Sequence, residues 1–492
     1  MNKSDKFEIP RALDDIHIDK KISSHKFVVS SSEPSANIAD LVLQQSIINV
    51  QTNDKTKVKI GLHDMMSLLL FDPSYAMKIS PSVLNQIINH ILNGDNAIKS
   101  IGFRLLVIFM QRNPESIAYI LNAFSPILVD SAIILIPAKY SCDFLIELLK
   151  YSKLLPPDHS NNIISYFISH NFHNIILSLF YDPLATFNTL QINVINILYH
   201  LPRNLFDQEN FDQFIRFLPL IFKHSRSAAK TAFLKYLESF EDVNFYLSLK
   251  EVAFIEELFI MTCLIPKENN ESITEYNDYV VASFKFLLKC IFRDRQIIKI
   301  FTDKNLRFDD KLYDFLTKTE VELSKQALEC SVTFFIEILN SDYQICESFA
   351  EGSMLIWAEH ELSKGNYHDQ ILALRIVATL AKFTLHIQKD QPSCILYILQ
   401  KINPISTMTD YLSSGSDNDL LLKLLVGIYS MWKTFLTNFV ASDVLSEAVS
   451  LMGDDEFKQT LYYLTESEDE YVSDEAQIMI KYIDEVGFGK EE

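Results

Sequence analysis

Apolar residues recur at helical spacing, three and four positions apart, almost without a pause from Ala36 onward. The breaks between these segments carry helix-capping side chains followed by proline, as in Ser80-Pro81, Asn113-Pro114 and Ser125-Pro126. Glycine is scarce, at 10 of 492 residues, whereas β-hairpins and nucleotide-binding turns use it heavily. The pattern therefore predicts an all-α chain of many helices joined by short loops, with no β-sheet.

The segments between the breaks have the lengths of ordinary helices. The clearest predicted helices are 81–93, 96–112, 137–152, 184–200, 274–293, 319–340, 367–386 and 418–440. Their faces rich in Leu, Ile and Phe, with short polar loops between them, are typical of antiparallel helix stacking.

Several helices carry a small residue inside a long apolar stretch, where a neighbouring helix can approach closely. These residues are Ala232, Ala282, Ala327, Ala373 and Gly427, separated by 50, 45, 46 and 54 positions. This spacing is close to the period of about 40–47 residues found in helical repeat proteins.

Two segments resemble armadillo repeats. In residues 92–121 a loop with Asp95 leads into a helix that carries Gly102, and in residues 412–432 Asp417 precedes Gly427 in the same way. On these motifs the chain resembles the armadillo/HEAT superfamily over residues ~36–486. The resemblance implies a right-handed superhelical solenoid that binds other proteins along a curved surface.

The subfamily can be tested on particular residues. Armadillo-type nuclear-import adaptors carry Trp-x-x-x-Asn pairs. Here the residue four positions after Trp357 is Glu361, and the residue four positions after Trp432 is Leu436. The pairs are therefore absent, which argues against that subfamily. Glycines between the first two helices of each repeat are also mostly missing, which favours repeats of two helices over repeats of three.

Composition divides the chain into three predicted parts. Residues 1–35 are rich in serine and poor in aromatic residues, as in a disordered arm. Residues 36–464 form the predicted solenoid, and residues 465–492 form an acidic C-terminal segment that is partly a helical cap.

Residues that could carry chemistry are few. No Walker or dinucleotide-binding glycine motif is present. His170 and His173 lack a third metal ligand nearby, and Asp158, His159 and Ser160 are neighbours in one loop, where triad residues point apart. The six cysteines form no Cys-x-x-Cys pair and lie in apolar helical patterns, which favours buried free thiols. We therefore expect no metal, no cofactor and no enzymatic activity.

The acidic charge is concentrated at the C-terminal end. Residues 441–492 hold 15 acidic and 3 basic residues, more than half of the net charge of −20. Two interpretations stay open: a solvated cap on the last helices, or a docking element for a basic partner. Ser467 precedes Glu468, Asp469 and Glu470, a context typical of acidophilic kinase sites, so it is a candidate phosphorylation site.

A basic stripe is the counterpart of this acidic end. Lys285, Lys289 and Arg293 lie four residues apart on one face of the predicted helix 274–293. The stripe is either a solvated helix face or a contact site, for a partner or for the acidic end of the chain itself.

These features favour a non-enzymatic scaffold or adaptor that binds another protein along the solenoid. The alternatives are a regulatory subunit of a multi-protein enzyme such as a phosphatase, a nuclear transport factor, and an enzyme with an unrecognised site. The acidic charge argues against binding to nucleic acid or to anionic membranes, and no run of about 18 uncharged apolar residues predicts a membrane span. We expect a monomeric protein in the cytoplasm or the nucleus.

Overall fold

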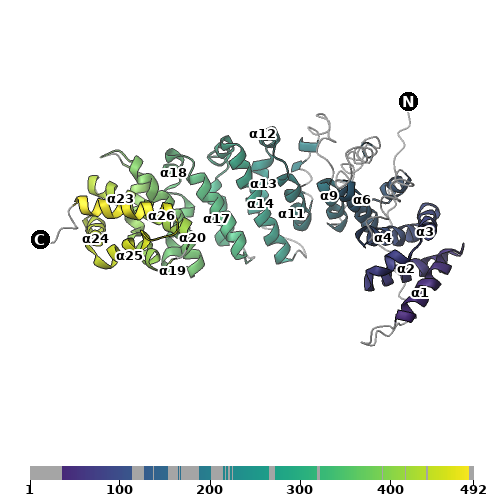
Figure 1. Ribbon diagram of the computed structural model, residues 1–492. Helices are drawn as coiled ribbons and strands as arrows, with labels where there is room; N and C mark the ends of the chain where they lie inside the picture. The colour runs from purple at the N-terminus through teal and green to yellow at the C-terminus, as the bar shows by residue number, and fades with distance from the viewer. Residues whose placement is uncertain are drawn as a thin grey trace, which may run out of the picture. The chain divides into compact units, whose positions relative to one another are not determined.

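The computed structural model consists of helices joined by short turns and loops, with no β-strand among the described residues (Figure 1). These residues are 36–112, 127–136, 138–152, 165, 167, 188–200, 214–216, 218–219, 222–223, 225–264, 272–318, 322–389, 392–415, 417–438 and 442–486. The chain divides into two compact units, Met1–Phe214 (unit 1) and Ile215–Glu492 (unit 2). The predicted arm of residues 1–35 lies outside the described residues.

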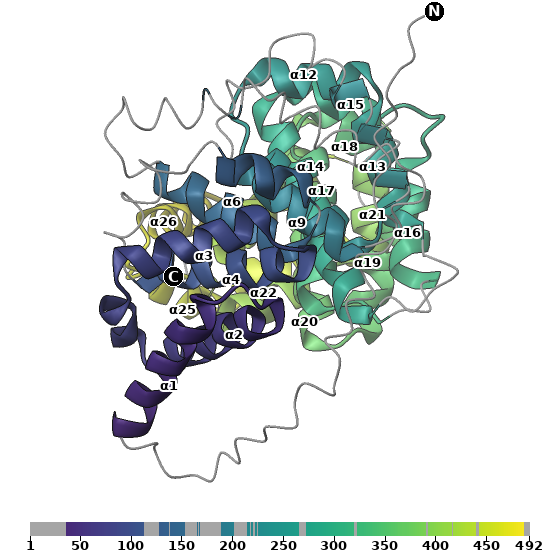
Figure 2. The same ribbon diagram turned by 90° about the vertical axis from the view of Figure 1, so that its right-hand side faces the viewer.

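Unit 1 is a stack in which α1 packs on α2, α2 on α4, α4 on α6 and α6 on α9 (Figures 1 and 2). Gly61 permits the close approach of α1 and α2, because a Cβ atom at this position would lie 2.7 Å from the carbonyl oxygen of Ser46. A side chain at Gly102 would likewise collide with Ile91 on α3. The helices are α1 (Ala36–Val50), α2 (Lys55–Phe71), η2 (Pro73–Lys78), α3 (Pro81–Asn93), α4 (Asn96–Arg112), α6 (Lys139–Ser152) and α9 (Asn188–His200).

Unit 2 begins its described helices with α11 (Ser227–Glu238) and then repeats one motif of three helices, the third of which is usually the longest. Short 3-10 turns, η4 (Arg295–Ile297) and η5 (Phe383–His386), lie beside two of the first helices. The repeats are α12 (Val243–Glu251), α13 (Phe254–Cys263) and α14 (Ile273–Arg293); α15 (Ile298–Phe301), α16 (Phe308–Lys318) and α17 (Lys325–Leu339); α18 (Tyr343–Phe349), α19 (Ser353–Lys364) and α20 (Tyr367–Lys382); α21 (Cys394–Ile402), α22 (Ile405–Ser414) and α23 (Asn418–Thr437); and α24 (Ser442–Gly453), α25 (Asp455–Leu464) and α26 (Glu470–Val486).

The third helices stack directly on one another. From α11 through α14, α17, α20 and α23 to α26, each packs against the next, and Figure 1 shows α11, α14, α17 and α20 side by side. We call α11 and the third helices of unit 2 the third-helix layer. The small residues that mark the sequence period all lie in this layer: Ala232, Ala282, Ala327, Ala373 and Gly427. At Gly427 a Cβ atom would lie 3.0 Å from Met408 Cε and 3.2 Å from Ala381 Cβ, so glycine permits the close contact of α20 and α23.

The repeats of unit 2 contain three helices, which differs from the two-helix repeats that the missing glycines favour. The first helices explain the difference, because α15 has only four residues and α18 only seven. A segment of one or two turns is too short to show the apolar periodicity by which helices are found in a sequence.

A buried carboxylate of one repeat caps a helix of the next. Asp309, on α16, accepts hydrogen bonds from the backbone N–H groups of Ser353 and Met354 at the start of α19. A side chain at Gly352 would run into this carboxylate. The first turn of a helix has N–H groups without partners inside the helix, so Asp309 stabilises both α19 and the contact between two repeats.

Two further side chains likewise accept hydrogen bonds at the first residues of a helix in the next repeat. Glu347, on α18, accepts hydrogen bonds from the hydroxyl of Ser393, at 2.9 Å, and from the N–H of Cys394 at the start of α21. The side-chain oxygen of Asn277, on α14, accepts one from the N–H of Ser324, at 2.7 Å, at the start of α17. These contacts fix how successive repeats lie against each other.

One helix among the described residues, α23, is long and apolar enough to cross a membrane by length and composition alone. It is a core helix of unit 2, since it packs against α20 on one side and α26 on the other, and 61% of its most apolar window is buried. Trp432 on this helix is fully buried and its ring lies 5.7 Å from that of Phe457.

Candidate protein-binding surface

From α11 to α23, the third-helix layer carries ten Lys and Arg residues against seven Asp and Glu residues. Its helices α11, α14, α20 and α23 each carry more Lys and Arg than Asp and Glu. The chain as a whole has a net charge of −20. The other two helices of the layer, α17 and α26, carry more Asp and Glu than Lys and Arg, so the positive charge is confined to these four helices.

The predicted basic stripe lies on α14, inside this layer. Lys289 is half-buried and donates a hydrogen bond to the main-chain oxygen of Glu238 on α11. Burial raises the pKa of Glu238, and Lys289 and Lys285 partly offset that rise. Lys285 and Arg293 are exposed. Lys289 therefore joins two helices, while Lys285 and Arg293 are open to a partner, and their role in binding stays a prediction.

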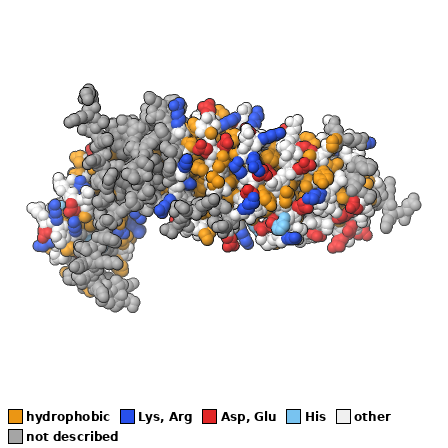
Figure 3. Space-filling model, turned by 180° about the vertical axis from the view of Figure 1, so that it is seen from behind, with side chains coloured by type: hydrophobic (Ala, Val, Ile, Leu, Met, Phe, Trp, Pro, Cys, Tyr) orange, Lys and Arg blue, Asp and Glu red, His pale blue; other side chains and the backbone are white. Residues whose placement is uncertain are grey.

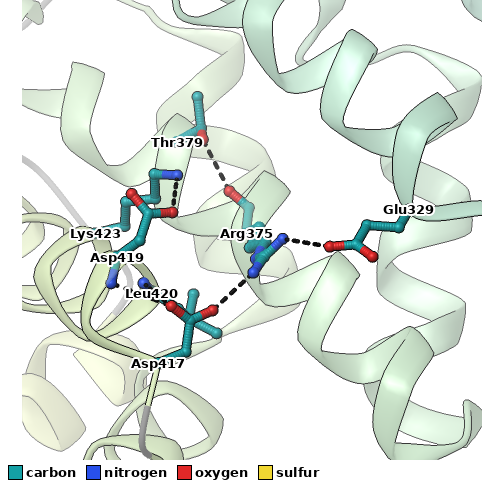
Figure 4. Close-up of polar contacts among 7 residues, drawn as sticks. All are labelled: Glu329, Arg375, Thr379, Asp417, Asp419, Leu420 and Lys423. Carbon is teal, nitrogen blue, oxygen red and sulfur yellow. Dashed lines mark hydrogen bonds and ion pairs between the residues drawn. The ribbon is translucent and has the colours of Figure 1, made fainter. Parts of the chain in front are cut away.

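A second basic side chain joins three elements of the layer (Figure 4). Arg375, on α20, lies 2.7 Å from the carboxylate of Asp417 at the start of α23 and 3.6 Å from that of Glu329 on α17. Burial alone would raise the pKa of Asp417, but the Arg375 guanidinium and the N–H groups of Leu420 and Asp419 together lower it. Charges of alternating sign thus run from α17 to α23 and align three successive repeats.

Two lysines of the layer have no ion pair within the described residues. Lys382, at the end of α20, lies 5.6 Å from the ring centroid of Phe383. Lys433, on α23, lies 4.9 Å from the ring centroid of Tyr429 and 5.9 Å from that of Tyr482 on α26. A hydrogen bond to Tyr429 raises the pKa of Lys433. The negative charge of Glu485 also contributes to the raised pKa of Lys433, without a close ion pair. Because both ammonium groups are exposed, they can also pair with an anionic group of another molecule.

These residues carried only a weak signal in the sequence. Arg375 and Lys433 are single charges inside long apolar stretches, as in "LALRIVATL" and "SMWKTFL". Such a charge on a core helix marks the side that faces solvent or an ionic partner. That Arg375 and Lys433 lie on neighbouring helices depends on the packing of α20 against α23, which periodicity alone does not reveal.

Ser467, the candidate phosphorylation site, lies in the turn between α25 and α26. Its hydroxyl accepts a hydrogen bond from the N–H of Asp469 at 3.2 Å. Asp469 in turn accepts from the N–H groups of Tyr471 and Val472 and so caps α26. Modification of Ser467 stays a prediction.

The residues considered for catalysis form no assembled site that the structure describes. His170, His173, Asp158, His159 and Ser160 lie outside the described residues. Within the described residues, no group of three His, Cys, Asp or Glu side chains could hold a metal ion. All six cysteines are free, and burial raises the pKa of Cys142 to about 12.

The two tryptophans are core residues rather than surface ligands. Trp357, on the second helix α19, and Trp432, on the third helix α23, are both buried. The layer therefore lacks the ladder of Trp-x-x-x-Asn pairs along its described helices, as the sequence indicates.

No protein-family model matches the sequence, and no curated protein matches it. Among solved structures the chain is similar to an engineered protein, at 13% identity and a TM-score of 0.56, with 90% of this chain and 99% of that chain covered. It is also similar to a chain of a SYS-1/POP-1 complex, at 11% identity and a TM-score of 0.47, covering 91% and 82%. A structure concerned with the interaction of cadherin and beta-catenin matches at 11% identity and a TM-score of 0.46, covering 92% and 84%.

At these identities the likeness concerns the fold, and the stacked repeats of unit 2 agree with it. The predicted fold class is confirmed where the structure describes the chain: these residues form helices and no strand, and the stacked three-helix repeats of unit 2 form a solenoid with an armadillo/HEAT-like fold.

Proposed function

We propose that the protein is a non-enzymatic scaffold whose third-helix layer, from α11 to α23, binds an extended segment of another protein. The observation that carries this proposal is the excess of Lys and Arg over Asp and Glu on α11, α14, α20 and α23, in a chain whose net charge is −20. Solenoids of this type present extended binding surfaces because each repeat contacts only its neighbours.

The charges of the layer suggest the chemistry of the partner segment. Lys289 and Arg375 have partners within the layer, while Lys382, Lys433, Lys285 and Arg293 face outward. An extended segment with carboxylates at intervals would pair with these groups. The apolar and aromatic surface around them, such as Tyr429, would add contact area of the kind that dominates protein interfaces.

Capture of partners from the native cell, followed by mass spectrometry, tests the proposal when charge-reversal variants are compared. We expect one partner in near-equal amount with the wild-type protein, and loss of that partner with Lys382→Glu/Lys433→Glu. The matched control is Lys364→Glu, because Lys364 is an exposed lysine on the second helix α19. Equal recovery of the partner by both variants, or no partner with any form, would contradict the proposal.

The identity of the partner also decides the biological role. A catalytic chain, such as that of a phosphatase, would make the protein a regulatory subunit, and a small GTPase would make it a transport factor. Imaging of the tagged protein in the same cells would test the proposed location in the cytoplasm or the nucleus.

A further inference from the structure

The last repeat presents three tyrosines to solvent around a single turn. Tyr463 is 76% exposed and Tyr462 is 57% exposed at the end of α25, and Tyr471 is 75% exposed at the start of α26. Their hydroxyl groups have no hydrogen-bond partner among the described residues. A single exposed apolar side chain is ordinary on a protein surface, but three exposed aromatic rings within a span of ten residues form a group.

The turn that joins α25 to α26 is held in place by its own hydrogen bonds. The hydroxyl of Ser473 donates to the main-chain oxygen of Thr465 at 2.7 Å, and Asp469 caps α26. Because α25 and α26 also pack against each other, the end of one helix and the start of the other stay close. The three tyrosines therefore lie on one ordered region of the last repeat.

Carboxylates lie close to these tyrosines in the sequence. Glu466, Glu468, Glu470 and Asp474 are in or beside the turn, and none of them forms an ion pair with a described residue. Figure 3 shows acidic side chains gathered toward the C-terminal end of unit 2. We call Tyr462, Tyr463 and Tyr471, with these four acidic residues, the tyrosine–acid surface.

A polar cap on the solenoid explains the acidic residues but not the tyrosines. The side of α26 that packs inward is apolar, with Val472, Ala476, Met479 and Ile483 buried. Tyr471 lies outside this buried set. Exposed rings grouped outside the apolar side of α26, which packs on α23 and α25, are typical of a surface that another molecule covers.

We propose that the tyrosine–acid surface docks a Lys- and Arg-rich segment of a partner protein. Guanidinium and ammonium groups stack on tyrosine rings, and the same groups pair with carboxylates. The negative charge of the surface repels nucleic acid and anionic lipid, which leaves a basic polypeptide as the fitting occupant. This surface lies at the end of α25 and the start of α26, outside the helices α11 to α23 that the proposed function uses, and it does not depend on that function.

Fluorescence anisotropy with the full-length protein tests the proposal. The probe is a fluorescein-labelled synthetic peptide of alternating arginine and glycine, and the same peptide with citrulline in place of arginine is the uncharged control. We expect the arginine peptide to bind, the citrulline peptide not to bind, and the affinity to fall as salt is raised.

Tyrosine variants separate this site from general attraction to an acidic protein. The double variant Tyr463→Ala/Tyr471→Ala should bind the arginine peptide about tenfold more weakly, since two ring contacts are lost. The variant Tyr463→Phe/Tyr471→Phe should bind like the wild type because it keeps both rings. Tyr397→Ala is the matched control, since Tyr397 is 62% exposed on α21, outside the surface.

Equal binding by the wild type and the double alanine variant would overturn the proposal, because net charge alone would then explain the affinity. Absence of binding to the arginine peptide would overturn it as well, and so would an equal loss in Tyr397→Ala.

Discussion

Removal of the Asp309 carboxylate should weaken the contact between two repeats. Asp309 is only 8% exposed, and its two oxygens accept the N–H groups of Ser353 and Met354 at the start of α19. In Asp309→Ala both N–H groups lose their partner, and Met354 is fully buried. Loss of a cap costs about 1 kcal/mol and a buried unsatisfied donor about 1–3 kcal/mol, so we expect a loss of about 2 kcal/mol.

Hydrogen exchange measures this effect locally. A loss of about 2 kcal/mol corresponds to roughly 30-fold faster exchange of the Ser353 and Met354 amides, provided that they exchange by local opening. Asp314→Asn is the matched control, because Asp314 lies on the same helix and its one ion pair with a described residue is the exposed pair with Lys318. Unchanged protection of α19 in Asp309→Ala would refute the reasoning.

The pH dependence of stability gives an independent test of the same residue. Burial raises the pKa of Asp309 to about 6, although the N–H groups of Met354 and Ser353 lower it in part. The unfolded chain has a carboxyl pKa of about 3.9, so between about pH 4 and pH 6 the folded state holds a proton that the unfolded state has lost. The contribution of Asp309 to stability therefore falls as pH rises through this range.

Asp309→Asn cannot ionise, so its deficit in melting temperature relative to the wild type should be larger near pH 5 than near pH 7.5. If the melting temperatures of the two proteins differ by the same amount at every pH, Asp309 does not titrate in this range.

Four other predictions follow from particular contacts. Gly427→Val should lower the melting temperature, because the new side chain collides with Met408 and Ala381 at a cost of about 1–3 kcal/mol in stability. Gly453 has open space around it, so Gly453→Val should lower the melting temperature less. Arg375→Met should destabilise the protein more at pH 7 than near pH 3, because the lowered pKa of Asp417 gives a contribution that is lost as pH falls; equal losses at both pH values would contradict this. Ellman's reagent should react slowly with the native protein at pH 8 and with all six thiols after denaturation, since burial raises the pKa of Cys142, Cys290 and Cys346. A chain ending at Thr465 should melt at a lower temperature than the full-length chain, because α26 packs its apolar side, including the buried Met479, against α23 and α25. An unchanged melting temperature would show that α26 does not stabilise unit 2.

Much of the helical layout could be predicted because its signals are local. The helix at Pro81–Asn93 begins with proline in its first turn and ends before Gly94, as the sequence indicates. The predicted helices 96–112, 274–293 and 367–386 agree with the structure to within one residue, the last as α20 followed by η5. The short helices α15 and α18 were missed, because one or two turns do not establish a period.

The candidate surface was predicted only in part. Lys285, Lys289 and Arg293 could be grouped because they lie on one helix at a spacing of four. Lys382 and Lys433 lie on different helices, 51 positions apart in the sequence, and only the packing of α20 on α23 relates them. The same packing reveals that Lys289 has a partner on α11, which no local pattern indicates.

The sequence by itself determined that this protein is an all-α repeat solenoid, because helical periodicity, capping residues and the spacing of small residues act within one helix or between neighbours. The tertiary structure decided which helices form the third-helix layer, which charges neutralise each other and which remain exposed. These properties depend on contacts between side chains some 40–50 residues apart, such as Arg375 with Asp417, and such contacts exist only after the repeats have stacked.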